Sequence, residues 1–210
     1  MSKAKWLFDI EQNTDEWHDL KLHKFSASQA NNLMMDKKNK GYQNLIAKIS
    51  EEYITKTECE SDSFKGNWAT ERGHELEPIA RNDYELRTFN AVNLVGIVIK
   101  DEFTCCSPDG YLDRKTLHQI KCPIFSTHKD YLIKSNNGDN WIKKDYFLQS
   151  QFELLVTDAD IVIFTSYHPM LPAIDAIIER NDNVIANIAE RLQEAIEEVK
   201  NEVDLILNLK

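Results

Sequence analysis

Two short segments carry an acid, an amide and a lysine at a spacing that could build a hydrolytic site. Asp109 follows Ser-Pro and precedes Gly, a composition that predicts the end of a strand and a turn. Residues 116–121 (TLHQIK) predict a second strand, which the following Cys-Pro ends because proline donates no ladder hydrogen bond. Side chains alternate along a strand, so Gln119 and Lys121 are expected on the same face.

These residues suit metal-dependent hydrolysis of a phosphodiester. Mg²⁺ prefers oxygen ligands, and the reaction needs a positioned water and positive charge beside the phosphate. The sequence offers Asp109, the carbonyl of Ile120 and Lys121 for these tasks. The arrangement resembles the core of the PD-(D/E)XK nucleases, where the acid and the residue two positions before the lysine hold Mg²⁺ and the lysine steers or deprotonates water. Gln119 stands at the second ligand position, where that core has a carboxylate.

A further acid is expected from a helix. Glu77 is the best candidate, because Gly73 lies four residues earlier and leaves room on the same helical face for a strand or substrate. A solvated acidic face, shared with Glu71 and Glu75, is the simpler explanation of this helix taken alone.

Gln149 and Gln151 lie on an otherwise apolar helix. Half-buried glutamines need partners, so one of them is expected to reach the site or a bound base. A hydrogen bond to the backbone explains them equally well.

The charge of the chain is unevenly distributed. The net charge is −10, yet residues 21–48 hold six Lys against one Asp, and residues 121–144 hold five Lys against two Asp. Residues 179–210 carry eight acids against four bases. A local basic groove in an acidic protein can bind phosphates, while solvated surface lysines are the plainer explanation.

The apolar pattern predicts an α/β chain forming a single domain over residues 1–210. Helices are expected near 14–20, 26–35, 42–56, 67–87 and 145–157, followed by a long amphipathic helix from 181 onward. Strands are expected at 94–100, 103–107, 116–121, 161–167 and 173–179, the first three as an antiparallel meander. Pro78 should kink its helix or begin the second half of it. Residues 135–140 are expected to form a loop.

Several classes of protein are excluded. The chain has no long apolar run and no signal-like leader, and its four cysteines make neither a disulfide framework nor a CxxC pair, which favours a reducing cytosol. Zinc is not expected, because the histidines show no ligand spacing such as HExxH.

Five motifs in order resemble the lambda-phage exonuclease family of viral-type recombination nucleases. They are Trp17-His-Asp-Leu-Lys-Leu with Ser26-Ala-Ser28, Gly73-x-x-x-Glu77, Ser107-Pro-Asp109-Gly, Gln119-Ile-Lys121-Cys-Pro and Tyr146-Phe-Leu-Gln149-x-Gln151. The resemblance implies metal ligands Asp109, Gln119 and Ile120, with Lys121, Glu77 and Gln149 in the active site. It also implies a 5′-phosphate pocket containing Lys21, Ser26 and Ser28, near Ser107. The basic loop that holds Lys38 is expected to assist there.

The resemblance further implies a fold and an activity. The fold is a PD-(D/E)XK α/β core, with a central mixed sheet flanked by helices and a long C-terminal helix. The activity is Mg²⁺-dependent digestion of duplex DNA from 5′-phosphorylated ends, 5′ to 3′, leaving 3′ overhangs for phage-type recombination, with Mn²⁺ as a possible substitute. A homotrimer around DNA, a phage single-strand annealing protein as partner and the bacterial cytoplasm as location are implied as well.

Two positions depart from the family pattern. Lys21 stands where an arginine is common, which gives up bidentate phosphate geometry. Gln119 lacks the charge of a carboxylate, so the chain is expected to bind DNA ends but cut them slowly, and Gln119→Glu to raise cleavage by orders of magnitude.

Two other function classes remain open from sequence. The chain could be a non-catalytic DNA-end binder that keeps the nuclease fold, for which Gln119 is the evidence. It could also be an interaction protein that uses the apolar stripe of its C-terminal helix, although a helix that packs on the core explains the stripe more simply.

Overall fold

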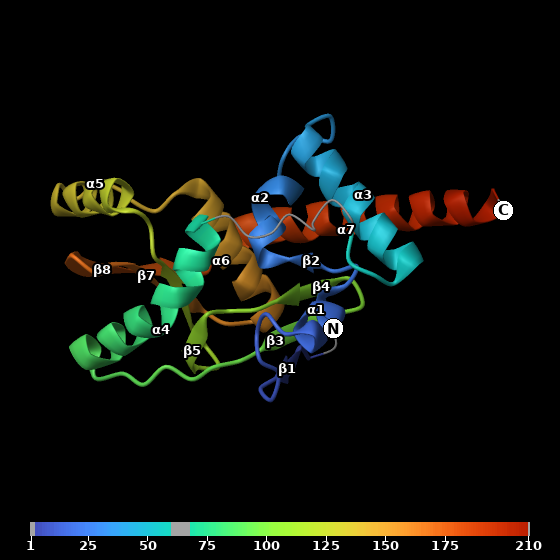
Figure 1. Cartoon of the computed structure of the whole chain (residues 1–210). Helices are drawn as coiled ribbons and strands as arrows, with labels where there is room; N and C mark the ends of the chain where they lie inside the picture. Colours follow the sequence, from blue (N-terminus) through green and yellow to red (C-terminus); the bar gives the residue numbers. More distant parts are fainter. Residues whose placement is uncertain (1–2, 60–67, 210) are drawn as a thin grey trace.

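The computed structural model describes residues 3–59 and 68–209 and contains two four-stranded mixed sheets with helices around them (Figure 1). The strands are β1 (Lys5–Leu7), β2 (Phe25–Ser26), β3 (Ile97–Asp101), β4 (Thr104–Cys106), β5 (Gly110–Asp113), β6 (Thr116–Lys121), β7 (Ile161–His168) and β8 (Leu171–Glu179). The helices are α1 (Asp15–Lys21), the short 3₁₀ turn η1 (Ala27–Gln29), α2 (Ala30–Leu33), α3 (Lys40–Thr55), α4 (Trp68–Thr88), α5 (Phe125–Asn136), α6 (Lys144–Thr157) and α7 (Asp182–Asn208). The expected α/β class and long C-terminal helix are confirmed.

The strands fall into two hydrogen-bonded sets at Asp109. The first sheet has the order β1-β3-β4-β2 and the second has the order β5-β6-β7-β8. The expected meander therefore does not exist as one unit, because β4 and β5 belong to different sheets and the segment 107–109 crosses between them. Within the second sheet, β6 pairs antiparallel with β5 and parallel with β7. This pairing buries β6 in the middle of the sheet.

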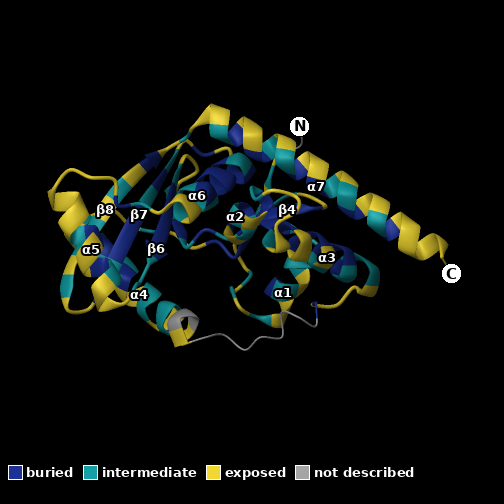
Figure 2. Cartoon of the chain, turned by 90° about the horizontal axis from the view of Figure 1, so that it is seen from above, coloured by how far each residue is buried: buried dark blue, intermediate teal, exposed yellow. Residues whose placement is uncertain are grey.

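Helix α6 packs against both sheets. It contacts β3 and β4 of the first sheet and β7 of the second. Phe152 joins the core beneath the first sheet, and Leu154 joins the core of the second. With apolar neighbours on most sides, most of α6 is buried, as Figure 2 shows by its dark blue colour.

Helix α7 lies along α3 and α6, and its C-terminal end extends beyond the body of the molecule (Figure 2). Ile188, Leu192 and Val199 of its apolar stripe are buried in the first core. Carboxylates of α7 accept hydrogen bonds from α3, at 2.9 Å from Tyr42 to Glu198 and 2.7 Å from Ser50 to Glu202. The stripe therefore packs on the core, as its period indicated.

Some elements escaped sequence analysis, and each has a weak local signal. Helix α5 was not expected, since His128 and Tyr131 are its only buried side chains and no side chain caps its first turn. Strand β5 occupies four residues that the turn signal at Asp109 concealed. Strands β1 and β2 are only three and two residues long. Pro78 lies inside the single helix α4 and does not divide it.

The four cysteines, all among the described residues, form no disulfide with one another. Within the described residues, no helix has both the length and the apolar character needed to cross a membrane.

Candidate active site

Asp109 is fixed at the point where the chain passes from one sheet to the other. Its Oδ2 accepts a hydrogen bond of 2.6 Å from the backbone N–H of Ile120 in β6. This bond orients the carboxylate, and Oδ1 accepts no hydrogen bond from the part of the chain that the structure describes. The expected proximity of Asp109 to the 119–121 strand is therefore a direct contact.

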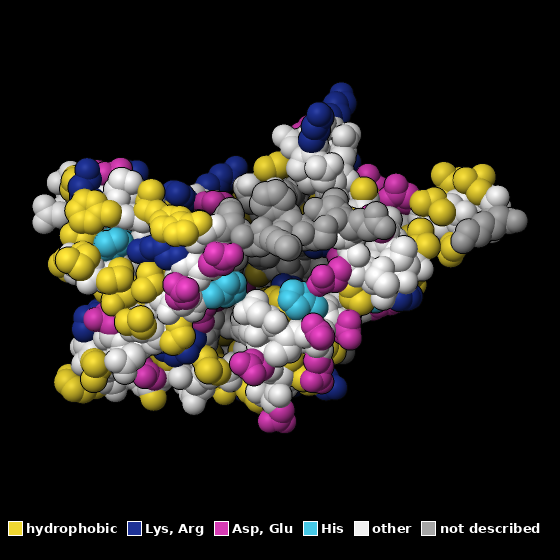
Figure 3. Space-filling view, viewed as in Figure 1, with side chains coloured by type: hydrophobic (Ala, Val, Ile, Leu, Met, Phe, Trp, Pro, Cys, Tyr) yellow, Lys and Arg dark blue, Asp and Glu magenta, His cyan; other side chains and the backbone are white. Residues whose placement is uncertain are grey.

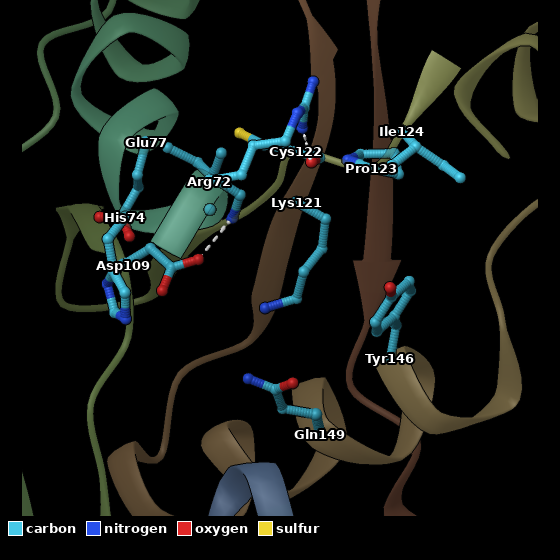
Figure 4. A pocket seen from close by; sticks show the side chains of 12 residues that line it. Arg72, His74, Glu77, Asp109, Lys121, Cys122, Pro123, Ile124, Tyr146 and Gln149 are labelled. Carbon is cyan, nitrogen blue, oxygen red and sulfur yellow. Dashed lines mark hydrogen bonds between the residues drawn. The ribbon is translucent and has the colours of Figure 1, made fainter. Parts of the chain in front are cut away.

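A cavity of about 520 Å³, the central cavity, collects most of the expected active-site residues. Figure 4 shows the Lys121 amine pointing into the space between the Asp109 carboxylate and the Gln149 amide. The Lys121 amine also lies 5.8 Å from the centre of the Tyr146 ring. The cavity is lined by Arg72, Gly73, His74, Glu77, Asp109, Ile120, Lys121, Cys122, Pro123, Ile124, Tyr146 and Gln149.

Glu77 reaches the same cavity from α4. Its Oε1 accepts a 2.6 Å charged hydrogen bond from Arg81, whose guanidinium also lies 3.4 Å from the backbone oxygen of Asp109. Burial and the nearby charge of Asp109 raise the pKa of Glu77 to about 7. A Cβ added at Gly73 would meet nothing, so the space expected beside this glycine is present and open.

Gln119 lies in a buried network between β6 and α6. Its Nε2 donates to Glu153 Oε1 at 3.0 Å, and its Oε1 accepts from Ser150 Oγ at 3.2 Å. Gln119 is fully buried and is not among the described residues that line the central cavity. Its expected role as a metal ligand is thus unsupported by its placement, and it stays a prediction.

Glu153 is the residue that sequence analysis missed. It is fully buried on α6, and Gln149 Nε2 also donates to its Oε1, at 3.2 Å. The pKa of Glu153 is raised to about 8, mainly by burial and secondly by the charge of Asp109. A charged residue between Phe152 and Leu154, in an apolar helix, was the available signal.

The two glutamines of α6 have different roles. Gln149 lines the central cavity. Gln151 is fully buried, donates to the backbone oxygen of Glu179 at 2.8 Å and accepts from the backbone N–H of Asn181 at 2.8 Å. Gln149 therefore reaches the site, whereas Gln151 connects α6 to the start of α7.

A second cavity of about 330 Å³, the N-terminal cavity, contains the residues expected to bind a 5′-phosphate. Lys21 Nζ lies 3.8 Å from the centre of the Trp17 ring, and burial lowers the pKa of Lys21. Ser26 Oγ and Ser28 Oγ are 3.2 Å apart. The cavity is lined by Asn13, Trp17, His18, Lys21, Leu22, Lys24, Ser26, Ser28, Gln29, Lys48, Glu52 and Glu58.

Ser107 and Lys38 lie outside this cavity lining. Ser107 is nearby, since its Oγ accepts a 3.0 Å hydrogen bond from the indole of Trp17. Lys38 is exposed in the turn before α3, and its neighbour Lys37 pairs with Glu194 and Glu198 of α7. The structure thus brings Ser107 close to the expected phosphate pocket and leaves Lys38 on the surface.

A third cavity of about 560 Å³, the bridging cavity, has wall residues in common with each of the other two. It shares His74, Glu77 and Asp109 with the central cavity. It also shares Asn13 with the N-terminal cavity. The expected active-site residues and the expected phosphate pocket therefore line neighbouring cavities.

His118 packs inside the protein on the strand that carries Gln119. It is fully buried, hydrogen-bonds Thr165 at 2.8 Å and packs 4.4 Å from the Tyr84 ring centre. Burial lowers the pKa of His118 to about 4, so its imidazole is neutral.

The carboxylates do not form a metal site by themselves. Among residues 3–59 and 68–209, no three His, Cys, Asp or Glu side chains form a group that could hold a metal ion. A divalent cation in the central cavity would need backbone or amide oxygens in addition, or a movement of the carboxylates.

The family is established by comparison with known proteins. The model of the YqaJ-like viral recombinase domain matches residues 16–160, more than half of the chain. The chain belongs to this family. The expected relationship to viral recombination exonucleases is therefore confirmed, although no curated protein matches the sequence.

Solved structures of exonucleases resemble this YqaJ-like chain. The alkaline exonuclease LHK-Exo from Laribacter hongkongensis superposes with a TM-score of 0.80 at 29% identity, covering 93% of this chain and 97% of its own. LHK-Exo in complex with dAMP gives a TM-score of 0.79 at 29% identity, covering 92% and 96%. A phage related exonuclease from Haemophilus somnus 129PT, with TM-score 0.64, 17% identity and coverage of 91% and 99%, shares the fold.

The raised pKa of Glu153 predicts how stability depends on pH. The native state holds this proton more tightly than the unfolded chain, where the pKa is near 4.5, so the free energy of unfolding falls as pH rises to about 8. Glu77 adds to the decline up to about pH 7. In metal-free protein, Glu153→Gln should flatten the curve of Tm against pH, while Glu202→Gln on α7 should leave it unchanged. Parallel curves for the parent and Glu153→Gln would contradict this assignment.

Proposed function

We propose that this YqaJ-like chain is a Mg²⁺-dependent exonuclease that digests one strand of duplex DNA from its 5′ end, leaving 3′ overhangs. The observation that carries the proposal is that the N-terminal cavity, with Lys21 and Ser28, and the central cavity, with Asp109 and Lys121, each share wall residues with the bridging cavity. Neighbouring cavities of this kind suit a DNA strand whose terminal phosphate binds in one while the bond to be cut lies in the other.

The donors at the central cavity suit Mg²⁺ or Mn²⁺. Asp109 and Glu77 offer carboxylate oxygens, and Ile120 lies in the cavity wall with a backbone carbonyl, all hard ligands of the kind these cations prefer. A bound divalent cation would polarise the phosphate and lower the pKa of water. The magnesium requirement is part of the proposal.

The side chains of this chain position the substrate and supply charge. The N–H of Ile120 holds the Asp109 carboxylate in one orientation. Lys121 places a cation in the central cavity, where it can stabilise the negative charge that develops on the phosphate and orient the attacking water. Gln149 can hydrogen-bond the phosphate or a base through its amide.

The family comparison supports a nucleic-acid substrate. LHK-Exo, a relative in structure, was solved with the nucleotide dAMP. A location in the cytoplasm of a bacterial host and a phage single-strand annealing protein as partner belong to the proposal as well.

A DNA-end binder without turnover is the second candidate. Its specific support is Gln119, an amide at the position where the nuclease core has a carboxylate. Incubation of the parent protein with Mg²⁺ and 5′-phosphorylated duplex distinguishes the two candidates, because only the nuclease releases nucleotides.

Asp109→Asn and Lys121→Ala should each reduce digestion of 5′-phosphorylated duplex by roughly 10²-fold or more, since each removes charge needed in the transition state. Binding of DNA ends, measured without a divalent cation, should persist in both variants. Lys5→Ala, an exposed lysine of β1, serves as the control and should digest normally. Full activity of Asp109→Asn would rule out the central cavity as the catalytic site.

Lys21→Ala should reduce the preference for phosphorylated over hydroxyl 5′ ends by about ten-fold or more, since a hydrogen bond to a charged group contributes ~1.5–3 kcal/mol. The measurement compares digestion rates on the two kinds of duplex end. Lys38→Ala, made in parallel, tests whether the basic loop contributes. Equal rates on both ends for the parent protein would show that the N-terminal cavity is not a phosphate pocket.

A homotrimer that encircles DNA is also proposed, by family resemblance. Apolar side chains gather over α5 and along the projecting end of α7 (Figure 3), including Phe125, Ile133, Leu205 and Leu207. Exposed apolar patches at opposite ends of a molecule suit contacts between copies in a ring. Light scattering at micromolar concentration should give the mass of three chains, and a monomer would contradict the ring.

A further inference from the structure

We propose that Glu153 of α6 supplies the second metal-binding carboxylate of this site, in place of position 119 of β6, so that Asp109 and Glu153 together hold the divalent cation. The inference rests on the proposed function and identifies the residues that support it. If Glu153 has this role, the chain is an active nuclease whose second acidic metal ligand is on helix α6 instead of strand β6.

The carboxylate that position 119 lacks is present on the neighbouring side chain, Glu153. The Gln119 amide nitrogen is 3.0 Å from Glu153 Oε1, so the two side chains meet head to head across the β6–α6 contact. The Glu153 carboxylate therefore lies next to the position that the carboxylate of a glutamate at position 119 would occupy. A chain with glutamate at position 119 and glutamine at position 153 would have the same number of carboxylates in the site.

Gln119 itself is poorly arranged to bind a cation. Its amide nitrogen is committed to Glu153, and its amide oxygen accepts a hydrogen bond from Ser150. Because the NH₂ group of Gln119 donates to Glu153, the amide oxygen of Gln119, its only possible ligand atom, is directed toward Ser150. The side chain is fully buried as well.

Glu153 has a buried oxygen that nothing in the described structure satisfies. Both hydrogen bonds that it accepts fall on Oε1, whereas Oε2 has no partner. A glutamine at position 153 could accept the same two bonds, so the network alone does not require a carboxylate. A buried charge is costly unless it is paired or binds a metal, and the charge of Lys121 offsets only part of the effect of burial on the pKa of Glu153.

Gln149 connects Glu153 to the central cavity. It lines that cavity, and its amide nitrogen lies 3.2 Å from Glu153 Oε1. The charges of Asp109 and Lys121, which also line this cavity, act on Glu153. A change of rotamer at the half-buried Gln149 is the movement by which Glu153 would reach the cavity and hold the cation together with Asp109.

The test measures Mn²⁺ binding by calorimetry in the absence of DNA, at mildly alkaline pH. Glu153→Gln should weaken binding by about ten-fold or more. The exchange variant Gln119→Glu/Glu153→Gln, which returns the carboxylate to the strand, should restore affinity to near that of the parent. Glu202→Gln, a carboxylate of α7 that bonds Ser50, is the control and should bind as the parent does.

Digestion of duplex DNA should follow the same order among these variants. Gln119→Glu alone should change digestion little, because the charge is already present at position 153. A rise of orders of magnitude in Gln119→Glu would overturn the proposal and favour the end binder, as would unchanged Mn²⁺ affinity in Glu153→Gln.

Thermal unfolding separates a metal ligand from a structural residue. Without metal and at a pH above 8, where Glu153 is ionised, Glu153→Gln should melt at the same temperature as the parent or about 2–4 °C higher, since it removes an unpaired buried charge and keeps both accepted hydrogen bonds. The stabilisation of the parent by Mn²⁺ should be lost in this variant. A large fall in Tm together with retained Mn²⁺ stabilisation would assign Glu153 to the scaffold and overturn the proposal.

Failure of the proposed function has a different signature. If the parent neither binds Mn²⁺ nor digests duplex, and Asp109→Asn changes neither property, the metal site itself is wrong. If the parent does both, Asp109→Asn loses both and Glu153→Gln keeps both, only the role of Glu153 is wrong.

Discussion

The contact between α6 and β6 determines where the charges of this site lie. Helix α6 is buried between the two sheets, so every polar side chain that it turns toward β6 must find its partner there. Gln119, Ser150 and Glu153 satisfy most of one another's hydrogen-bonding groups in this contact. The one oxygen left over, Oε2 of Glu153, is buried and has no hydrogen-bond partner among the described residues.

The site balances three carboxylates against two cationic side chains. The charge of Asp109 raises the pKa of both Glu77 and Glu153, and the charge of Lys121 lowers both. Negative charges gathered in this way repel one another and favour proton uptake in the absence of metal. This repulsion is of the kind that a bound divalent cation would relieve.

The acids of α7 lie apart from the lysines of the N-terminal cavity. Glu194 and Glu198 of α7 are engaged with Lys37 and Tyr42, away from the cavities. The N-terminal cavity holds Lys21, Lys24 and Lys48 against Glu52 and Glu58. Net charge therefore describes the solubility of this chain better than its affinity for phosphate.

Sequence alone determined the elements with strong periodicity and the residues with fixed local roles. The amphipathic period of α7 and the helical pattern of α1 depend on neighbours in the chain, and both were predictable. Ordered motifs likewise identified Asp109, Lys121, Glu77 and Gln149, which the structure brings to one cavity.

Tertiary structure decided what depends on contacts between distant segments. The division of the strands into two sheets, the weakly amphipathic α5 and the separate roles of Gln149 and Gln151 could not be read from local pattern. Glu153 is the clearest case, because it lies 34 positions from Gln119 in the chain yet meets it at 3.0 Å. A motif fixes which residue stands at a ligand position, but only the packing of a helix on a strand decides which side chain brings its charge there.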